Sequence, residues 1–182
     1  MNQMMKTTLL ALALMACFSC SAQRWMTRNG NVNFFSETPV ENIEATNDMA
    51  SGLLTDEGRF AFRVPILGFR FEKALMEEHF NENYMESTRY PNGTFEGSIE
   101  GWNKTMKDGQ WHEVIARGAL VIHGIENARE IPSKIKWSDS AWEIRTTFPV
   151  STADHEIPVP KMVRNKIAES IDVSVELTLT TQ

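Results

Sequence analysis

Cysteine is almost absent from this chain, and both copies, Cys17 and Cys20, lie within the first 22 residues. A chain that loses this segment has no thiol, which excludes disulfide bonds and thiol catalysis from the remainder. The sequence also lacks a glycine-rich phosphate loop, a nucleophile elbow, and a serine, histidine and acid set in a recognisable context. The usual sequence signatures of an enzyme are therefore missing.

Basic residues are few and scattered, with 18 Lys and Arg against 24 Asp and Glu, a formal net charge of −6. The first 22 residues hold one basic residue, Lys6, and no acidic one, so the remainder has 17 basic and 24 acidic residues, a charge of −7. Nucleic acids and anionic lipid surfaces call for a concentrated basic patch. We therefore expect neither as a main partner.

Residues 1–22 are predicted to be an export signal and are excluded from the fold argument. A single basic residue precedes the apolar run from Leu9 to Phe18, which is too short for a membrane span. Small residues suit cleavage after Ala22, whereas a lipoprotein signal would make Cys17 the lipid-modified first residue. We expect an exported, periplasmic protein without a transmembrane span in residues 23–182, or one anchored in the envelope through Cys17.

Residues 23–182 are enough for one domain with a sizeable core, and most of them follow the apolar and polar alternation of β-strands. The clearest strand lies between Ile167 and Thr180, where every second residue from Ile171 onward is apolar. The residues 40–54 are strand-like, but their apolar residues are irregularly spaced. The other expected strands are 29–35, 60–71, 94–102, 111–123, 126–137 and 141–150.

The alternation is interrupted once, from Glu72 to Glu86. Apolar residues such as Leu75, Met76 and Phe80 recur there at helical spacing, with most of the glutamates on the other side. This pattern predicts an amphipathic helix of about three turns. Proline and glycine predict a kink in the strand before it, at Pro65 and Gly68, and a return to strand at Pro91.

Short turns at 55–58, 107–110 and 138–140 join the expected strands, and glycines in 94–102 suit a tightly coiled wall. About eight antiparallel strands with one inserted helix predict an all-β fold, an eight-stranded antiparallel barrel with the helix near its mouth. Closure into a barrel removes the exposed edge strands. A two-sheet sandwich is the alternative that the pattern leaves open.

Several segments of the chain together resemble the YceI-like family of exported bacterial proteins. They are 36–41 with 43–45, the helix 75–86 with 90–91, 95 and 97, the stretch 118–125, and the closing strand from 167. The resemblance covers all of residues 23–182 and implies a lipocalin-like barrel whose elongated apolar lumen holds a polyisoprenoid or an isoprenoid-quinone tail. It transfers no catalytic motif. The residues 126–130 are more polar than the segment that family members usually have at this place. The resemblance therefore does not predict the shape of the barrel rim there.

Apolar wall residues alone can bind such a lipid, because each buried methylene contributes about 0.8 kcal/mol. The candidate lumen residues are Phe60, Phe62, Val64, Phe69, Phe71, Phe95, Ile99, Val114, Leu120, Ile122, Ile144, Phe148, Val173, Val175 and Leu177. The same residues could instead fill a solid core. The candidate portal, which could equally be a fixed cap, consists of Leu75, Met76, Phe80 and Met85.

Histidines give no metal signal. His79 lies among glutamates on the expected helix, but no second histidine follows at the third or fourth position, as a helical metal site would require. His112, His123 and His155 lie on separate segments. We therefore expect no metal and no cofactor.

Three functional hypotheses follow. The first is binding or carriage of an apolar lipid, which requires a continuous tunnel. The second is an envelope interaction module without a small ligand, which exposed tryptophans on one face would favour: Trp25, Trp102, Trp137 and Trp142. The third is an enzyme acting on a lipid, which requires convergent polar side chains inside the barrel. The sequence identifies neither the lipid nor whether the protein forms a homodimer.

Overall fold

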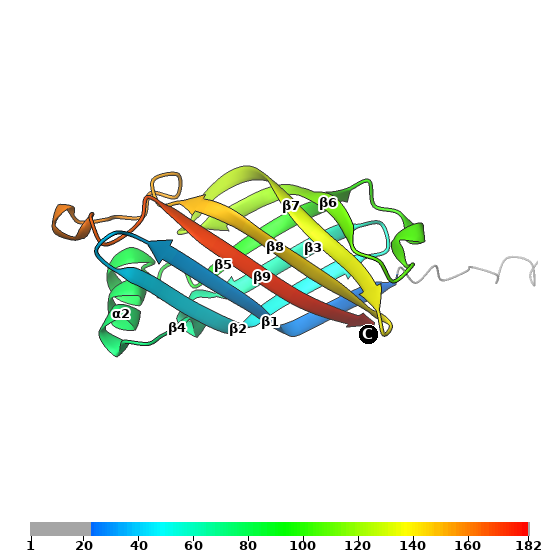
Figure 1. Cartoon of the computed structure of the whole chain (residues 1–182), viewed down its shortest axis with the longest axis horizontal. Coiled ribbons are helices and arrows are strands. Elements are labelled where there is room, and N and C mark those ends of the chain that lie inside the picture. Colours follow the sequence, from blue (N-terminus) through cyan, green and yellow to red (C-terminus); the bar gives the residue numbers. More distant parts are fainter. Residues whose placement is uncertain (1–22, 182) are drawn as a thin grey trace, which may run out of the picture.

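The computed structural model describes residues 23–181, and the expected export signal at 1–22 lies outside the described residues. Eight long strands form one closed antiparallel barrel (Figure 1), which confirms the predicted fold class. These strands are β1 (Arg24–Glu37), β2 (Asn42–Thr55), β3 (Arg59–Pro65), β5 (Asn92–Glu100), β6 (His112–Ile122), β7 (Ile125–Ser138), β8 (Ala141–Ser151) and β9 (Ser170–Thr181). The two-residue strand β4 (Arg70–Phe71) pairs with β2 alone.

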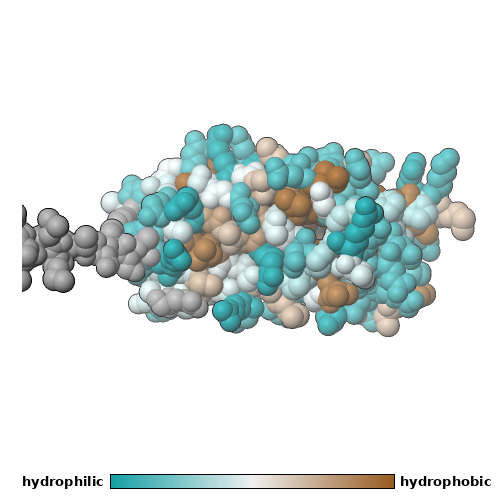
Figure 2. Space-filling model, turned by 180° about the vertical axis from the view of Figure 1, so that it is seen from behind, coloured by the Kyte–Doolittle hydropathy of each residue, from teal (hydrophilic) through white to brown (hydrophobic). Residues whose placement is uncertain are grey.

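The barrel closes because β1 pairs with both β2 and β9. Around the wall the order is β1, β9, β8, β7, β6, β5, β3 and β2, so each long strand has a partner on both sides. Buried side chains are mainly apolar, while the face of the molecule seen in Figure 2 is largely hydrophilic with separate apolar patches. This division explains the alternation in the sequence.

The interruption between β3 and β5 contains the predicted kink and helix. A 3-10 turn, Ile66–Gly68, follows Pro65, and the α-helix α2 (Ala74–His79) continues as a π-helix, Phe80–Tyr84. These 11 residues make the expected three turns, and we call residues 74–84 the helical cap. The cap lies at one end of the barrel, where the segment 152–169 also projects (Figure 1, orange).

The irregular apolar spacing in β2 has a cause in the register between β1 and β2. The pairing shifts between Thr27 and Val32, with Gly30 opposite Ala50 between them. As a result, the buried positions in β2 change from odd numbers up to Asn47 to even numbers from Ala50. A β-bulge of this kind moves later side chains to the opposite face, which a strict two-residue period cannot represent.

Glycine is required where the barrel wall is tightly coiled. Gly97 and Gly118 lie opposite each other on β5 and β6. A Cβ atom on Gly97 would overlap the carbonyl oxygen of Arg117, and one on Gly118 would overlap that of Glu96. The backbones can approach this closely only because both residues lack side chains.

Candidate functional site

An apolar cavity of about 520 Å³ occupies the half of the barrel next to the helical cap. Inward-facing side chains of the strands form its wall, and the cap and the segment 152–169 form its roof. Its lining includes exposed residues of the cap region, such as Leu75, which is 61% exposed. The cavity therefore opens to solvent at this end, which we call the mouth.

The structure brings nine of the fifteen candidate lumen residues together around this cavity. They are Phe62, Val64, Phe69, Phe71, Leu120, Ile122, Phe148, Val173 and Val175. The four candidate portal residues also line it, on the cap side: Leu75, Met76, Phe80 and Met85. The apolar set that the sequence singled out is thus largely arranged around one space.

The other six candidates belong to the core without lining the cavity. They are Phe60, Phe95, Ile99, Val114, Ile144 and Leu177. Phe60 and Phe95 pack against each other with ring centroids 4.9 Å apart. These side chains lie on the inward faces of their strands, as the alternation predicted, but beyond the end of the cavity.

Tryptophans fill the end of the barrel opposite the mouth. Trp25 and Trp142 are buried, and their ring centroids lie 6.1 Å apart. Trp137 and Trp102 pack against Trp142 at 5.1 and 4.8 Å, and the Lys107 ammonium lies 4.2 Å from the Trp137 ring centroid. These four tryptophans therefore form no exposed cluster of the kind that would favour a partner-binding face.

Phenylalanines seat the helical cap on the barrel. The Phe80 ring lies 5.4 Å from Phe34 of β1, 5.5 Å from Phe69 and 5.1 Å from Phe71 of β4, measured between centroids. All four rings also line the cavity. These ring contacts pack the cap against β1 and the segment 69–71.

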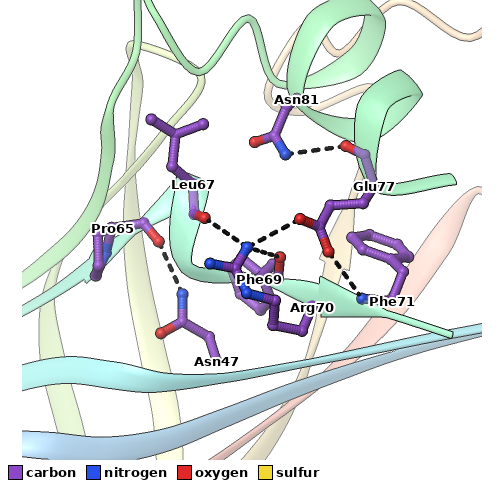
Figure 3. A network of polar contacts seen from close by, with 8 residues as sticks. All are labelled: Asn47, Pro65, Leu67, Phe69, Arg70, Phe71, Glu77 and Asn81. Carbon is purple, nitrogen blue, oxygen red and sulfur yellow. Dashed lines mark hydrogen bonds and ion pairs between the residues drawn. The ribbon is translucent and has the colours of Figure 1, made fainter. Parts of the chain in front are cut away.

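Polar bonds fix the first turn of the cap to the strand below it (Figure 3). Nη1 of Arg70 donates to Oε1 of Glu77 at 2.9 Å, and the Phe71 N–H donates to Oε2 of the same carboxylate at 3.3 Å. Nδ2 of Asn81 donates to the Glu77 carbonyl oxygen at 2.9 Å. The first turn is thereby tied to β4 at Glu77.

A buried asparagine anchors the 3-10 turn that precedes the cap (Figure 3). Asn47 is 1% exposed, and its Nδ2 donates to the Pro65 carbonyl oxygen at 2.8 Å, while its Oδ1 accepts from the Met49 N–H at 2.8 Å. Gly68 packs so closely on this amide that a Cβ would lie 2.6 Å from Nδ2. Asn47 therefore fixes the direction in which the chain leaves β3.

Charged side chains from three segments meet at the mouth. Glu41, before β2, accepts from Lys73 at 3.2 Å and lies 3.9 Å from the Lys166 ammonium. All three line the cavity, as does Tyr84, whose pKa is raised by burial. The apolar cavity thus has these charged groups at its solvent end.

Two histidines, His123 and His155, connect Glu86, which follows the helical cap, to the β6–β7 turn and the segment 152–169. Nε2 of His123, at the β6–β7 turn, lies 2.9 Å from Oε2 of Glu86, and its Nδ1 lies 3.2 Å from the His155 carbonyl oxygen. His155 is fully buried, and burial lowers its pKa. Nearby, Nδ2 of Asn127 donates to the Asp154 carbonyl oxygen at 2.9 Å, so the polar stretch after Gly124 holds the segment 152–157.

No group of three or more His, Cys, Asp or Glu in residues 23–181 is arranged to hold a metal ion. Over the same residues, no helix is both long enough and apolar enough to cross a bilayer. Ser36, a polar residue of the cavity wall, is already engaged, since its Oγ accepts from the Ala168 N–H at 2.9 Å.

Sequence reasoning missed the part of the lining that the segment 152–169 contributes. Its apolar residues that face the cavity are Ile157, Val159, Val163 and Ile167. Ile157 and Val159 alternate with Pro158 and Pro160, and this short alternation was the available signal. The convergence of Glu41 on two lysines had no local signal, because the three residues are far apart in the sequence.

These features define a lipocalin-like barrel, closed by packed tryptophans at one end and containing an apolar cavity that opens beside a helical cap. The model of the YceI-like domain matches residues 24–179, so the chain belongs to the YceI-like family. A search of curated proteins found no match.

Solved structures share the fold at low sequence identity. A polyisoprenoid binding domain from Saccharophagus degradans has a TM-score of 0.76 and 13% identity, over 89% of this chain and 100% of that chain. BcnA from Burkholderia cenocepacia has a TM-score of 0.69 and 13% identity, over 84% and 96%. The YCEI protein of Campylobacter jejuni has a TM-score of 0.55 and 12% identity, over 68% and 72%.

Proposed function

We propose that this protein binds a long apolar lipid of the polyisoprenoid or isoprenoid-quinone type, with the tail in the cavity and the polar end at the mouth. The observation that carries the proposal is the cavity of about 520 Å³, whose interior lining is apolar and whose charged lining residues lie at the mouth. Family membership and the structural likeness to a polyisoprenoid binding domain support it.

The energetics suit a single apolar chain. Each buried methylene contributes about 0.8 kcal/mol, so fifteen buried carbons supply roughly 12 kcal/mol before the costs of association, which are on the order of 4–15 kcal/mol. A chain of two isoprene units would bind weakly, whereas three or four units give useful affinity. Affinity therefore comes from the apolar wall and needs no specific polar contact inside.

We propose a binding role rather than catalysis. Several polar side chains that line the cavity already have partners: Glu41 is paired with Lys73 and Lys166, and Ser36 accepts from a backbone N–H. Within residues 23–181, the lining hydroxyls of Ser36 and Thr152 bond to backbone groups rather than to a general base. The apolar run in residues 1–22 further supports action after export, in the periplasm or anchored to the envelope through Cys17.

Native mass spectrometry of the mature protein, purified from an exporting bacterial host, tests this proposal. We expect an added mass that organic extraction recovers as an isoprenoid or a quinone. The matched variants are Val173→Trp, which fills the cavity, and Asp172→Trp, which places the same ring on the outer face. Bare protein that stays bare after incubation with polyprenols and quinones, or equal loading of both variants, would contradict the proposal.

A further inference from the structure

The cavity stops partway along the barrel. On β9 its lining includes Ile171, Val173 and Val175, but not Leu177, the next inward-facing residue. On β3 it includes Phe62 and Val64, but not Phe60. The same boundary therefore appears on strands from different parts of the wall.

Three side chains form this boundary, which we call the floor: the buried Leu177 and Phe95 and the partly buried Phe60. Leu177 is 9% exposed and lies so close to Gly30 that a Cβ atom there would overlap its Cδ2. A Cβ on Gly52 would lie 3.4 Å from its Cδ1. Two glycines thus leave room for the Leu177 side chain, and the Phe60–Phe95 pair, with centroids 4.9 Å apart, completes the floor.

Beyond the floor, buried side chains occupy the interior of the barrel. Leu179 follows Leu177 and is 1% exposed, and it is joined there by the buried Leu54, Trp25 and Trp142. Close-packed protein interiors yield little to an inserted group. A chain that enters at the mouth therefore ends at Leu177.

The cavity volume sets the length of chain that fits. A methylene group needs about the same room as a water molecule in the liquid, about 30 Å³. A cavity of about 520 Å³ then holds roughly 17 carbon-sized groups, between three and four isoprene units of five carbons each.

We propose that the floor limits the bound isoprenoid chain to about 15 to 20 carbons, so that Leu177, Phe60 and Phe95 determine chain-length specificity. This inference rests on the proposed function and narrows it. Carbons beyond this length stay at the mouth, in contact with water, and add little affinity. The ligand class is therefore an isoprenoid of farnesyl to geranylgeranyl length, or a longer one of which only this much is held.

A chain-length series of prenyl alcohols with 10, 15, 20 and 30 carbons tests the limit by titration calorimetry. In the wild-type protein we expect affinity to rise roughly tenfold or more per isoprene unit up to 15–20 carbons. Between 20 and 30 carbons it should change less than about threefold. If affinity continues to rise tenfold per isoprene unit up to 30 carbons, the inference is wrong.

Two variants move the floor in opposite directions. Leu177→Ala deepens the cavity and should extend the rise in affinity by about one isoprene unit. Val175→Phe raises the floor, so the rise in affinity should end about one isoprene unit earlier. This second variant keeps the test decisive if Leu177→Ala does not fold. Leu53→Ala, on the outward face of β2, is the matched control and should leave the series unchanged.

The outcomes separate this inference from the proposed function. If affinity rises with chain length without a plateau, or if neither variant moves the plateau, the floor does not set the chain length. The proposal of lipid binding would still stand. Failure of every prenyl alcohol and quinone to bind would refute the proposed function itself.

Discussion

His155 should make the folded protein less stable as the pH falls below 6.5. Its ring is fully buried, and Nδ1 lies 3.3 Å from the Ile125 carbonyl oxygen. A carbonyl oxygen only accepts hydrogen bonds, so this contact requires a proton on Nδ1. With Nδ1 assigned as the donor to Ile125, Nε2 carries no proton in the neutral ring, and within residues 23–181 it makes no hydrogen bond. Burial lowers the pKa of His155 below its usual 6.5, because a second ring proton would create a charge away from water, whereas the backbone carbonyls of Ile125 and Ile122 act in the opposite direction.

The direction and size of the effect follow from proton linkage. Below pH 6.5 the unfolded chain binds a proton at His155 that the folded chain does not, so the free energy of unfolding falls with falling pH. The slope approaches about 1.4 kcal/mol per pH unit until the folded-state pKa is reached. Above pH 6.5 the contribution is constant. The nearby charges act in opposite directions, since Arg129 lowers the pKa and Asp154 raises it.

Urea unfolding at pH 5.0, 6.0 and 7.5 measures this dependence. His155→Asn keeps a donor near the Ile125 carbonyl and removes the titrating nitrogen, so its stability should vary less with pH than that of the wild type. His79→Asn changes an exposed histidine of the cap and should leave the wild-type slope intact. If His155→Asn keeps the full slope, the buried ring is not the source and the reasoning is wrong.

Three further substitutions test separate parts of the fold. Gly97→Ala should lower the Tm by roughly 2–10 °C in a thermal melt, because the new Cβ would overlap the Arg117 carbonyl, while the outward-facing Ser98→Ala should not. Asn47→Ala should cost roughly 1–3 kcal/mol in urea unfolding, since the Pro65 carbonyl loses its donor; unchanged stability would contradict this. Phe80→Ala should speed hydrogen exchange in residues 74–84 at least tenfold, whereas the exposed Leu75→Ala should not.

Much of the fold could be predicted from the sequence because the barrel separates apolar and polar residues on a period of two. The eight strands, the three-turn helix and the kink at Pro65 follow from this period and its interruptions. The exception is β2, where the bulge near Gly30 changes which residues face inward. A register shift depends on the partner strand, which a local pattern does not contain.

The depth of the cavity could not be predicted in the same way. Val175 and Leu177 occupy successive apolar positions of one alternation, each with a polar residue on both sides, yet only Val175 lines the cavity. What separates them is the room that Gly30 and Gly52 leave beside Leu177. An inward-facing residue looks the same in the sequence whether it meets a packed core or an open lumen.

Photo-cross-linking with a diazirine-bearing farnesol analogue tests the central claim most directly, because it shows where the chain lies. The account predicts adducts on inward residues of β8 and β9, such as Phe148, Val173 and Val175, that excess geranylgeraniol suppresses. Adducts on the outward neighbours Thr147 and Asp172, or labelling that geranylgeraniol does not suppress, would contradict binding in the lumen.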